Sequence, residues 1–215
     1  MNDMLIPNIG SQVGPLLPYL IIACGGLLVM LVDAFVRTLK KDHLSYLTMF
    51  VLIAAVVVQI IGDRSNGQLL GGMMITSEFT RFFNYLFAGI GVMTTIFATG
   101  IYDRDSHYRP EFYPLVLFSI LGMMVLAAAN DLITLFLGLE TMSLSTYILV
   151  GGVRGNIRSS EAGFKYLILG GFSSAFLLMG MALLYGFAGG TGFAALRTAQ
   201  AEGQPDVMLV GLGSA

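Results

Sequence analysis

The chain has 215 residues, of which 56% are hydrophobic and only 11% are charged, and its formal net charge is −2. Soluble domains carry about 25% charged residues, so this composition excludes a water-soluble globule, a disordered chain and a nucleic-acid-binding protein. A single cysteine excludes an internal disulfide, an iron–sulfur cluster and a cysteine-based zinc site. We therefore expect neither a metal nor a cofactor in this chain.

Charged residues lie in short groups that long apolar runs separate. A membrane-spanning helix needs about 20 mostly apolar residues, and these runs are continuously apolar, whereas the strands of a membrane barrel alternate. The pattern predicts an all-α, polytopic bundle of transmembrane helices. The predicted helices are residues 15–36, 44–62, 80–102, 112–130, 132–152 and 160–187.

The distribution of basic residues predicts the orientation of the bundle. The connections after the first, third and fifth helices carry seven of them, and the opposite side carries three. The seven are Arg37, Lys40, Lys41, Arg104, Arg109, Arg154 and Arg158. Because basic loops stay on the cytoplasmic side, we expect the N-terminus to lie outside.

Two local signals concern the ends and contacts of these helices. Asp131, directly after Asn130, predicts an N-cap for the fifth helix at a tight turn. Gly138 and the pair Gly170-Gly171 favour close approach between helices.

The sequence after the sixth helix predicts two further elements. Phe193, Leu196 and Gln200 have helical spacing, so residues 193–201 form either a short interfacial helix or a loop with one helical turn. From Val207 to Ala215 the chain is apolar again, over a run too short to cross a bilayer. We expect this run to begin a seventh helix, and the chain to be the N-terminal part of a longer protein.

Glu140 is the one charged residue between positions 132 and 153. Placing a charge at the centre of a membrane costs roughly 2.5–3.5 kcal/mol on insertion scales, and desolvation favours the uncharged form of a carboxyl group. Glu140 can therefore take up and release a proton, which predicts a proton relay. The alternative is a neutral side chain that joins two helices by a hydrogen bond.

Lys165 is the one charged residue between positions 162 and 196, roughly 10 Å along the helix from Arg158. Its side chain either extends back to the interface or lies in a partly hydrated interior, where it can release and recapture a proton. Helix geometry separates it from Glu140 by about 10 Å along the membrane normal. A link through water is therefore expected rather than a direct salt bridge.

Hydroxyl side chains flank both charged residues. Each either bonds its own backbone, ties two helices together or lines a chain of water molecules. They are Thr141, Ser143, Ser145, Ser173 and Ser174.

Two elements together carry a resemblance to a known family. One is Leu137-Gly138-Leu139-Glu140, and the other joins Lys165-Tyr166 to Ser173-Ser174-Ala175. With them, residues 110–187 closely resemble the subunit N family of the bacterial proton-translocating NADH:quinone oxidoreductase, respiratory complex I. The first three helices match this family less well.

The resemblance implies an antiporter-like fold built from inverted repeats with additional peripheral helices. Residues 1–110 would be the peripheral helices, and residues 111–215 the first, incomplete part of the proton-translocating repeat. Glu140 falls on the glutamate of the family's relay and Lys165 on its sixth-helix lysine. Both are therefore expected to take part in proton transfer.

The resemblance also implies partners. FMN and iron–sulfur clusters are expected in partner subunits, and NADH and quinone are reached only through the complex. The chain itself would contact other membrane subunits and the lipid of a bacterial inner membrane. Two alternatives remain: a subunit of a sodium/proton antiporter or a membrane-bound hydrogenase, and a scaffold subunit that transports nothing.

Overall fold

The computed structural model describes residues 9–35, 41–62, 66–102, 111–153 and 155–201. Within these ranges the chain forms six long helices and one short one, and all six predicted spans are confirmed as helices. They are α1 (Ile9–Phe35), α2 (Lys41–Ile61), α3 (Glu78–Tyr102), α4 (Phe112–Ala128), α5 (Leu132–Gly151), α6 (Ile157–Ala188) and the short α7 (Phe193–Ala201). Helix α7 shows that residues 193–201 form a short helix rather than a loop with one turn, whereas the run from Val207 to Ala215 lies outside the described residues.

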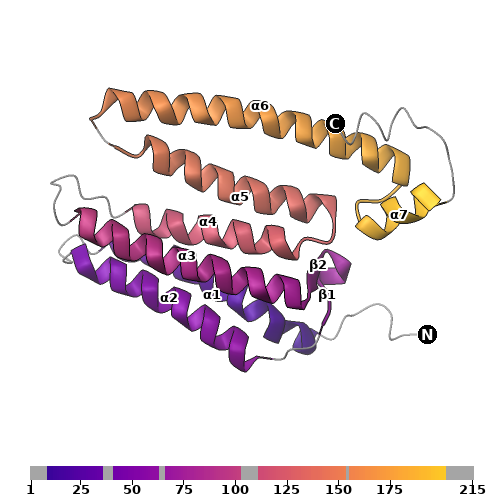
Figure 1. Ribbon diagram of the computed structural model, residues 1–215, viewed down its shortest axis with the longest axis horizontal. Coiled ribbons are helices and arrows are strands. Elements are labelled where there is room, and N and C mark those ends of the chain that lie inside the picture. Colours follow the sequence, from indigo (N-terminus) through magenta and orange to yellow (C-terminus); the bar gives the residue numbers. More distant parts are fainter. Residues whose placement is uncertain (1–8, 36–40, 63–65, 103–110, 154, 202–215) are drawn as a thin grey trace.

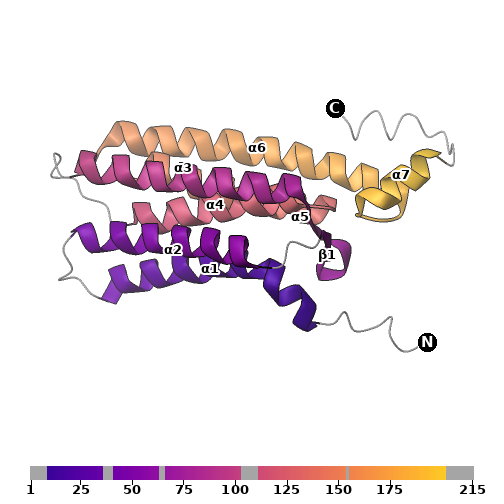
Figure 2. The same cartoon turned by 60° about the horizontal axis from the view of Figure 1, so that its bottom comes forward.

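The helices lie side by side in a bundle whose centre is α4 (Figure 1). Helix α4 packs against α1, α2, α3 and α5, and α6 packs on α5. In both views α6 lies at the opposite side of the bundle from α1 and α2 (Figure 2). The central position of α4 explains its composition, because neighbours surround it and no polar face is needed: Leu117, Ile120 and Met124 are fully buried at helical spacing.

Five helices are long and apolar enough to cross a membrane: α1, α2, α3, α5 and α6. Helix α4 is apolar but has 17 residues, about 26 Å of helix against a hydrocarbon layer of about 30 Å. Helix α6 has 32 residues, or about 48 Å, and therefore exceeds that layer by several turns. The chain is a multi-pass membrane protein.

A small hairpin that the sequence analysis did not predict lies between α2 and α3. Strands β1 (Gly67–Leu69) and β2 (Met74–Thr76) pair antiparallel, and the 3-10 turn η1 (Leu70–Gly72) joins them. Strands of three residues are too short to show the alternation by which strands are predicted. The turn depends on glycine, because Gly71 and Gly72 have φ values of 68° and 94°.

The turn between α4 and α5 joins the elements at one end of the bundle. Asn130 donates from its backbone N–H to Met73 O (2.9 Å) and from Nδ2 to Gly72 O (2.8 Å), which fixes the hairpin. On its other side, Phe193 N–H donates to Asn130 O (3.2 Å) and Leu132 N–H donates to Thr191 O (2.9 Å). The hairpin, this turn and α7 thus lie at the same end (Figure 1).

Candidate functional site

Glu140 lies near the middle of α5 and is half-buried. Its Oε1 accepts a short hydrogen bond from the Ser174 hydroxyl of α6. Glu140 is about 12 Å along the helix from Leu132, and Ser174 is about 21 Å from the end of α6 at Ala188. The contact therefore joins two membrane-spanning helices well away from the ends of both.

Helix α5 presents opposite faces to α4 and α6. Gly138 faces α4, where a Cβ atom on it would lie 2.7 Å from Leu126 N and 3.0 Å from Gly122 O. Glu140 follows two residues later, about 200° around the helix, and its carboxyl group reaches α6. The backbone contact at Gly138 therefore fixes the rotation of α5 that directs Glu140 to Ser174, and it confirms the predicted close approach at this glycine.

The contact between α5 and α6 continues from Ser174 towards the α5–α6 connection. The ring of Tyr147 packs edge-on against Tyr166, with centroids 4.7 Å apart, and a Cβ atom on Gly170 would overlap the Tyr147 hydroxyl. Gly170 thus leaves room for the Tyr147 side chain between the two helices, which confirms the predicted close approach at this glycine. At its neighbour Gly171, no atom of the described residues lies within 4 Å of an added Cβ atom, so the described helices do not approach closely there.

Asp131 begins α5 in the way that the sequence predicted. Its backbone is extended (φ −141°, ψ 165°), and its carboxyl Oδ1 accepts a hydrogen bond of 2.6 Å from Thr134 N–H. The side chain is buried. This N-cap fixes the first turn of the helix that carries Glu140.

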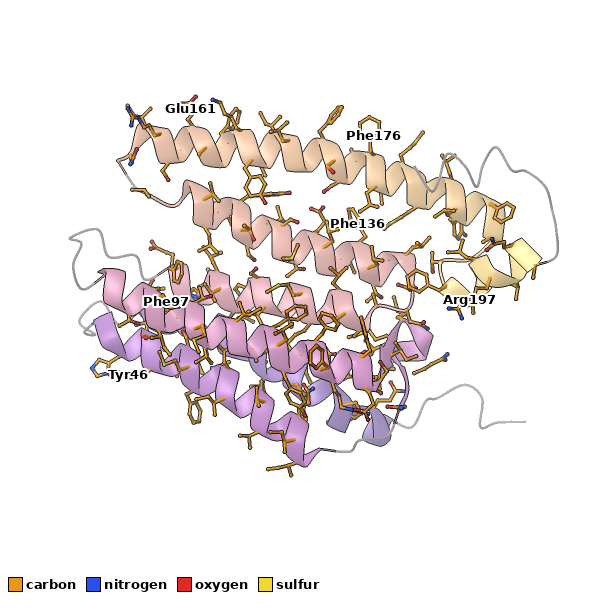
Figure 3. All side chains as sticks on the ribbon, in the orientation of Figure 1. Tyr46, Phe97, Phe136, Glu161, Phe176 and Arg197 are labelled. Atoms are coloured by element: carbon orange, nitrogen blue, oxygen red, sulfur yellow. The ribbon has the colours of Figure 1, made fainter. Side chains whose placement is uncertain are left out.

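Lys165 is separate from this contact. Its Nζ pairs with Glu161 Oε1 at 2.6 Å, and both side chains are exposed, by 68% and 56%. Ser174, the partner of Glu140, lies nine residues further along α6, or about 14 Å. The structure thus brings Glu140 to Ser174 but does not bring it to Lys165. Glu161, labelled in Figure 3, lies on the outer side of α6 at the end opposite α7.

Sequence reasoning missed two partners in this region. Ser174 was one of five flanking hydroxyl residues, and nothing in the sequence singled it out, because the rotation of α6 against α5 sets its direction. The partner of Lys165 did have a signal, since Glu161 precedes it by four residues, which is a favourable spacing for an ion pair on a helix.

Possible metal ligands do not gather in the part of the chain that the structure describes. There, no three His, Cys, Asp or Glu side chains lie close enough together to hold an ion. At the Glu140–Ser174 contact, the hydroxyl group can donate and accept hydrogen bonds, and a carboxyl group accepts when ionised and can also donate when protonated.

Residues 129–213 match the family model described as the transmembrane domain of NADH:quinone oxidoreductase and Mrp antiporters. NADH-quinone oxidoreductase subunit N from Trichlorobacter lovleyi is 36% identical over 197 residues, which is 91% of this chain and 40% of the relative. Subunit N from Rhodospirillum rubrum is 39% identical over 193 residues, which is 88% of this chain and 40% of the relative. Residues 129–213 therefore belong to the transmembrane family of NADH:quinone oxidoreductases and Mrp antiporters.

The antiporter-like fold is also present in a solved structure. Respiratory complex I from Thermus thermophilus contains a chain that is 24% identical, with a TM-score of 0.66 over 91% of this chain and 42% of that one. The chain therefore spans about 40% of the length of its antiporter-like relatives. Glu140, Ser174 and Lys165 all lie within the residues that match the family model.

Proposed function

We propose that the chain belongs to a membrane subunit that passes protons across a bacterial inner membrane, coupled to electron transfer from NADH to quinone. One observation carries this proposal: a carboxyl group, Glu140, hydrogen-bonded to Ser174 between two helices that cross the membrane. An ionisable residue in such a position is costly and is most often functional. The names of the subunit N relatives support the redox partner.

In this proposal Glu140 is the group that changes its protonation state. When it is ionised, the Ser174 hydroxyl donates to it and lowers the cost of the charge. When a proton arrives, Glu140 becomes neutral, and the hydroxyl can turn to accept from it. Lys165 would load or modulate this group through intervening water, because helix geometry separates Lys165 from Ser174 by about 14 Å.

The electron-transfer reaction belongs to partner subunits in this proposal. FMN, iron–sulfur clusters, NADH and quinone would all bind there, and this chain would contact other membrane subunits and lipid. We further propose that residues 1–110 are peripheral helices, that residues 111–215 are the first part of the proton-translocating repeat, and that the N-terminus lies outside. The excess of basic residues after the first, third and fifth helices supports this orientation.

A subunit of a sodium/proton antiporter is the second candidate, because the family that matches residues 129–213 includes the Mrp antiporters. It shares the membrane bundle and the half-buried Glu140 with the first candidate. The two differ in their driving force: an antiporter exchanges ions along an imposed gradient, whereas the oxidoreductase subunit requires turnover of NADH.

Purification of the native assembly through a tag on this subunit tests the proposal. We expect flavin, iron–sulfur absorbance and NADH:quinone activity to purify with it, in mild detergent and in constant ratio. An assembly of membrane subunits that lacks flavin and iron–sulfur absorbance, and that exchanges sodium for protons in vesicles, would contradict the redox proposal and favour the antiporter.

A further inference from the structure

A small polar pocket lies between α1, α2 and α3, away from Glu140 and its contact with α6. Its volume is about 30 Å³. Apolar side chains dominate most contacts in this bundle, yet several polar side chains line the pocket. They are Tyr19, Gln59, Thr76, Thr80, Arg81 and Asn84.

Asn84 leaves one polar atom without a partner at this pocket. The residue is 4% exposed, and its Nδ2 donates to Tyr19 Oη at 3.2 Å. Its Oδ1 is buried and has no hydrogen-bond partner among the described residues. Turning the amide group over would exchange the two atoms and leave Nδ2 without a partner instead. In either orientation one amide atom of this pocket-lining residue lacks a partner among the described residues, which is costly in a membrane helix.

Tyr19 provides a second group with spare capacity. Its oxygen accepts the bond from Asn84, so its own O–H hydrogen is available to a third group. A molecule that accepts from Tyr19 and donates to Asn84 Oδ1 would complete a closed set of hydrogen bonds. That molecule must both donate and accept.

The size and charge of the pocket decide the class of ligand. A volume of about 30 Å³ is larger than the roughly 10–15 Å³ that a cavity needs in order to hold a water molecule. Arg81 does not draw an anion into the pocket, because its Nη2 already binds Glu78 Oε1 at 2.6 Å and Asn66 Oδ1 at 2.8 Å. The remaining candidate is a small neutral molecule.

We propose that this pocket is a built site for one water molecule, which bridges Asn84 of α3 and Tyr19 of α1. The water donates to Asn84 Oδ1 and accepts from the Tyr19 hydroxyl. Buried water molecules make about three hydrogen bonds, and Thr80 and Arg81 offer the further contact from α3. The site joins the helices at the end of the bundle that carries the β1–β2 hairpin, and it takes no part in proton transfer at Glu140.

A cryo-EM map of the assembled native complex, at a resolution that shows ordered water, tests the proposal directly. We expect one density peak at about 2.7–3.2 Å from Asn84 Oδ1 and within the same range of Tyr19 Oη. A pocket without density would overturn the proposal, provided that water is visible beside other polar groups of α1–α3. A larger density that extends to Arg81 would also overturn it and indicate an anionic headgroup.

Paired substitutions give an independent readout. Tyr19→Phe with Asn84→Leu removes both polar groups while keeping their approximate shape. If a water molecule is bound, this pair loses its bonds, and the temperature at which half of the tagged subunit dissociates from the complex falls by about 3 °C or more. If the pocket is dry, the same pair removes a costly free atom, and an unchanged or higher temperature overturns the proposal.

A matched control is available on neighbouring helices. The hydroxyls of Ser45 and Thr99 bond each other at 2.8 Å between α2 and α3, and neither residue lines the pocket. Replacing both partners, by Ser45→Ala with Thr99→Val, is expected to change the dissociation temperature little. A fall as large as that of the Tyr19 and Asn84 pair would show that loss of any polar pair explains the effect, and would overturn the proposal.

Discussion

The Ser174 hydroxyl places a hydrogen-bond donor at a carboxyl group in the membrane interior. Hydrogen bonds to charged groups contribute about 1.5–3 kcal/mol, so this bond is strong enough to orient the Glu140 side chain towards α6. Neighbouring hydroxyl groups act differently: Ser145 and Thr141 bond the carbonyl groups of their own helix. Ser174 is thus a positioning residue for Glu140.

We predict that Ser174→Ala lowers coupled proton translocation about tenfold, because it removes the donor that stabilises the ionised carboxyl group. The measurement is proton uptake by vesicles that contain the assembled complex and are driven by NADH. Ser173→Ala is the control, since Ser173 is exposed on the same helix and should leave the rate unchanged. Equal losses in both variants would contradict a specific role for Ser174.

Lys165 gives a prediction that separates proton transfer from stability. Exposed i,i+4 ion pairs contribute about 0.3–0.5 kcal/mol, so Lys165→Gln should leave assembly intact even though it breaks the pair with Glu161. We predict that it nevertheless lowers proton translocation, because it removes the group that we propose exchanges protons with the relay.

Glu161→Gln is the matched control for Lys165, because it breaks the same ion pair but keeps the lysine. Translocation should remain at the level of the unmodified complex. If both variants lose the same amount, the ion pair explains the effect and Lys165 is not a relay residue. If proton translocation is unchanged in both variants, Lys165 only places its charge at the membrane interface.

The sequence predicted the positions and contacts of some single residues but not of others. Glu140 was identified because it is the one charge in a long apolar run, and the cost of such a charge needs no structure to estimate. Asp131 was identified as the N-cap of α5 because helix capping depends on local sequence. The Glu140–Ser174 contact was not predictable, because it depends on how two helices rotate against each other.

At the scale of elements, close backbone contact sets the position of α5. A Cβ atom on Gly138 meets the backbone of α4 at Leu126 and Gly122, which cannot move aside as a flexible side chain can. The contact lies two residues from Glu140 and therefore links packing to the geometry of the proposed relay.

We predict that Gly138→Ala destabilises the subunit by about 1–3 kcal/mol, because the added methyl group forces α4 and α5 apart. Thermal dissociation of the purified complex measures the loss. Gly171→Ala is the control: Gly171 lies in a membrane helix, and no atom of the described part of the chain lies within 4 Å of an added Cβ there. Its complex should be as stable as the unmodified one or slightly more so. The packing argument fails if Gly171→Ala destabilises as much as Gly138→Ala.

Helices were predicted correctly where a long stretch of sequence carries the pattern. Runs of about 20 apolar residues identify helices regardless of their neighbours, and the six long helices follow from them. The ends were less precise: α1 begins at Ile9 rather than near residue 15, because polar residues continue the helix past the apolar run. The hairpin from Gly67 to Thr76 was missed, since its pairing depends on the α4–α5 turn, which is distant in sequence.

For the whole molecule, the α4–α5 turn joins two regions that the chain places far apart. Asn130 binds the hairpin before α3 on one side and Phe193, the first residue of α7, on the other. Helices α1–α4 pack around one core, and α5 and α6 extend from it (Figure 1). The proposed relay therefore lies between α5 and α6, outside the core that α1–α4 form.

In the proposed function, Glu140 exchanges protons during coupled turnover. The most direct test of this exchange is the number of protons translocated per NADH oxidised, measured in vesicles that contain the assembled complex with Glu140→Gln and, as a control, with Glu140→Asp. We predict a lower ratio for glutamine, which is similar in size to glutamate but does not ionise, and partial retention for aspartate, which keeps the carboxyl group. An unchanged ratio for Glu140→Gln, in a complex with its full flavin and iron–sulfur content, would contradict the account.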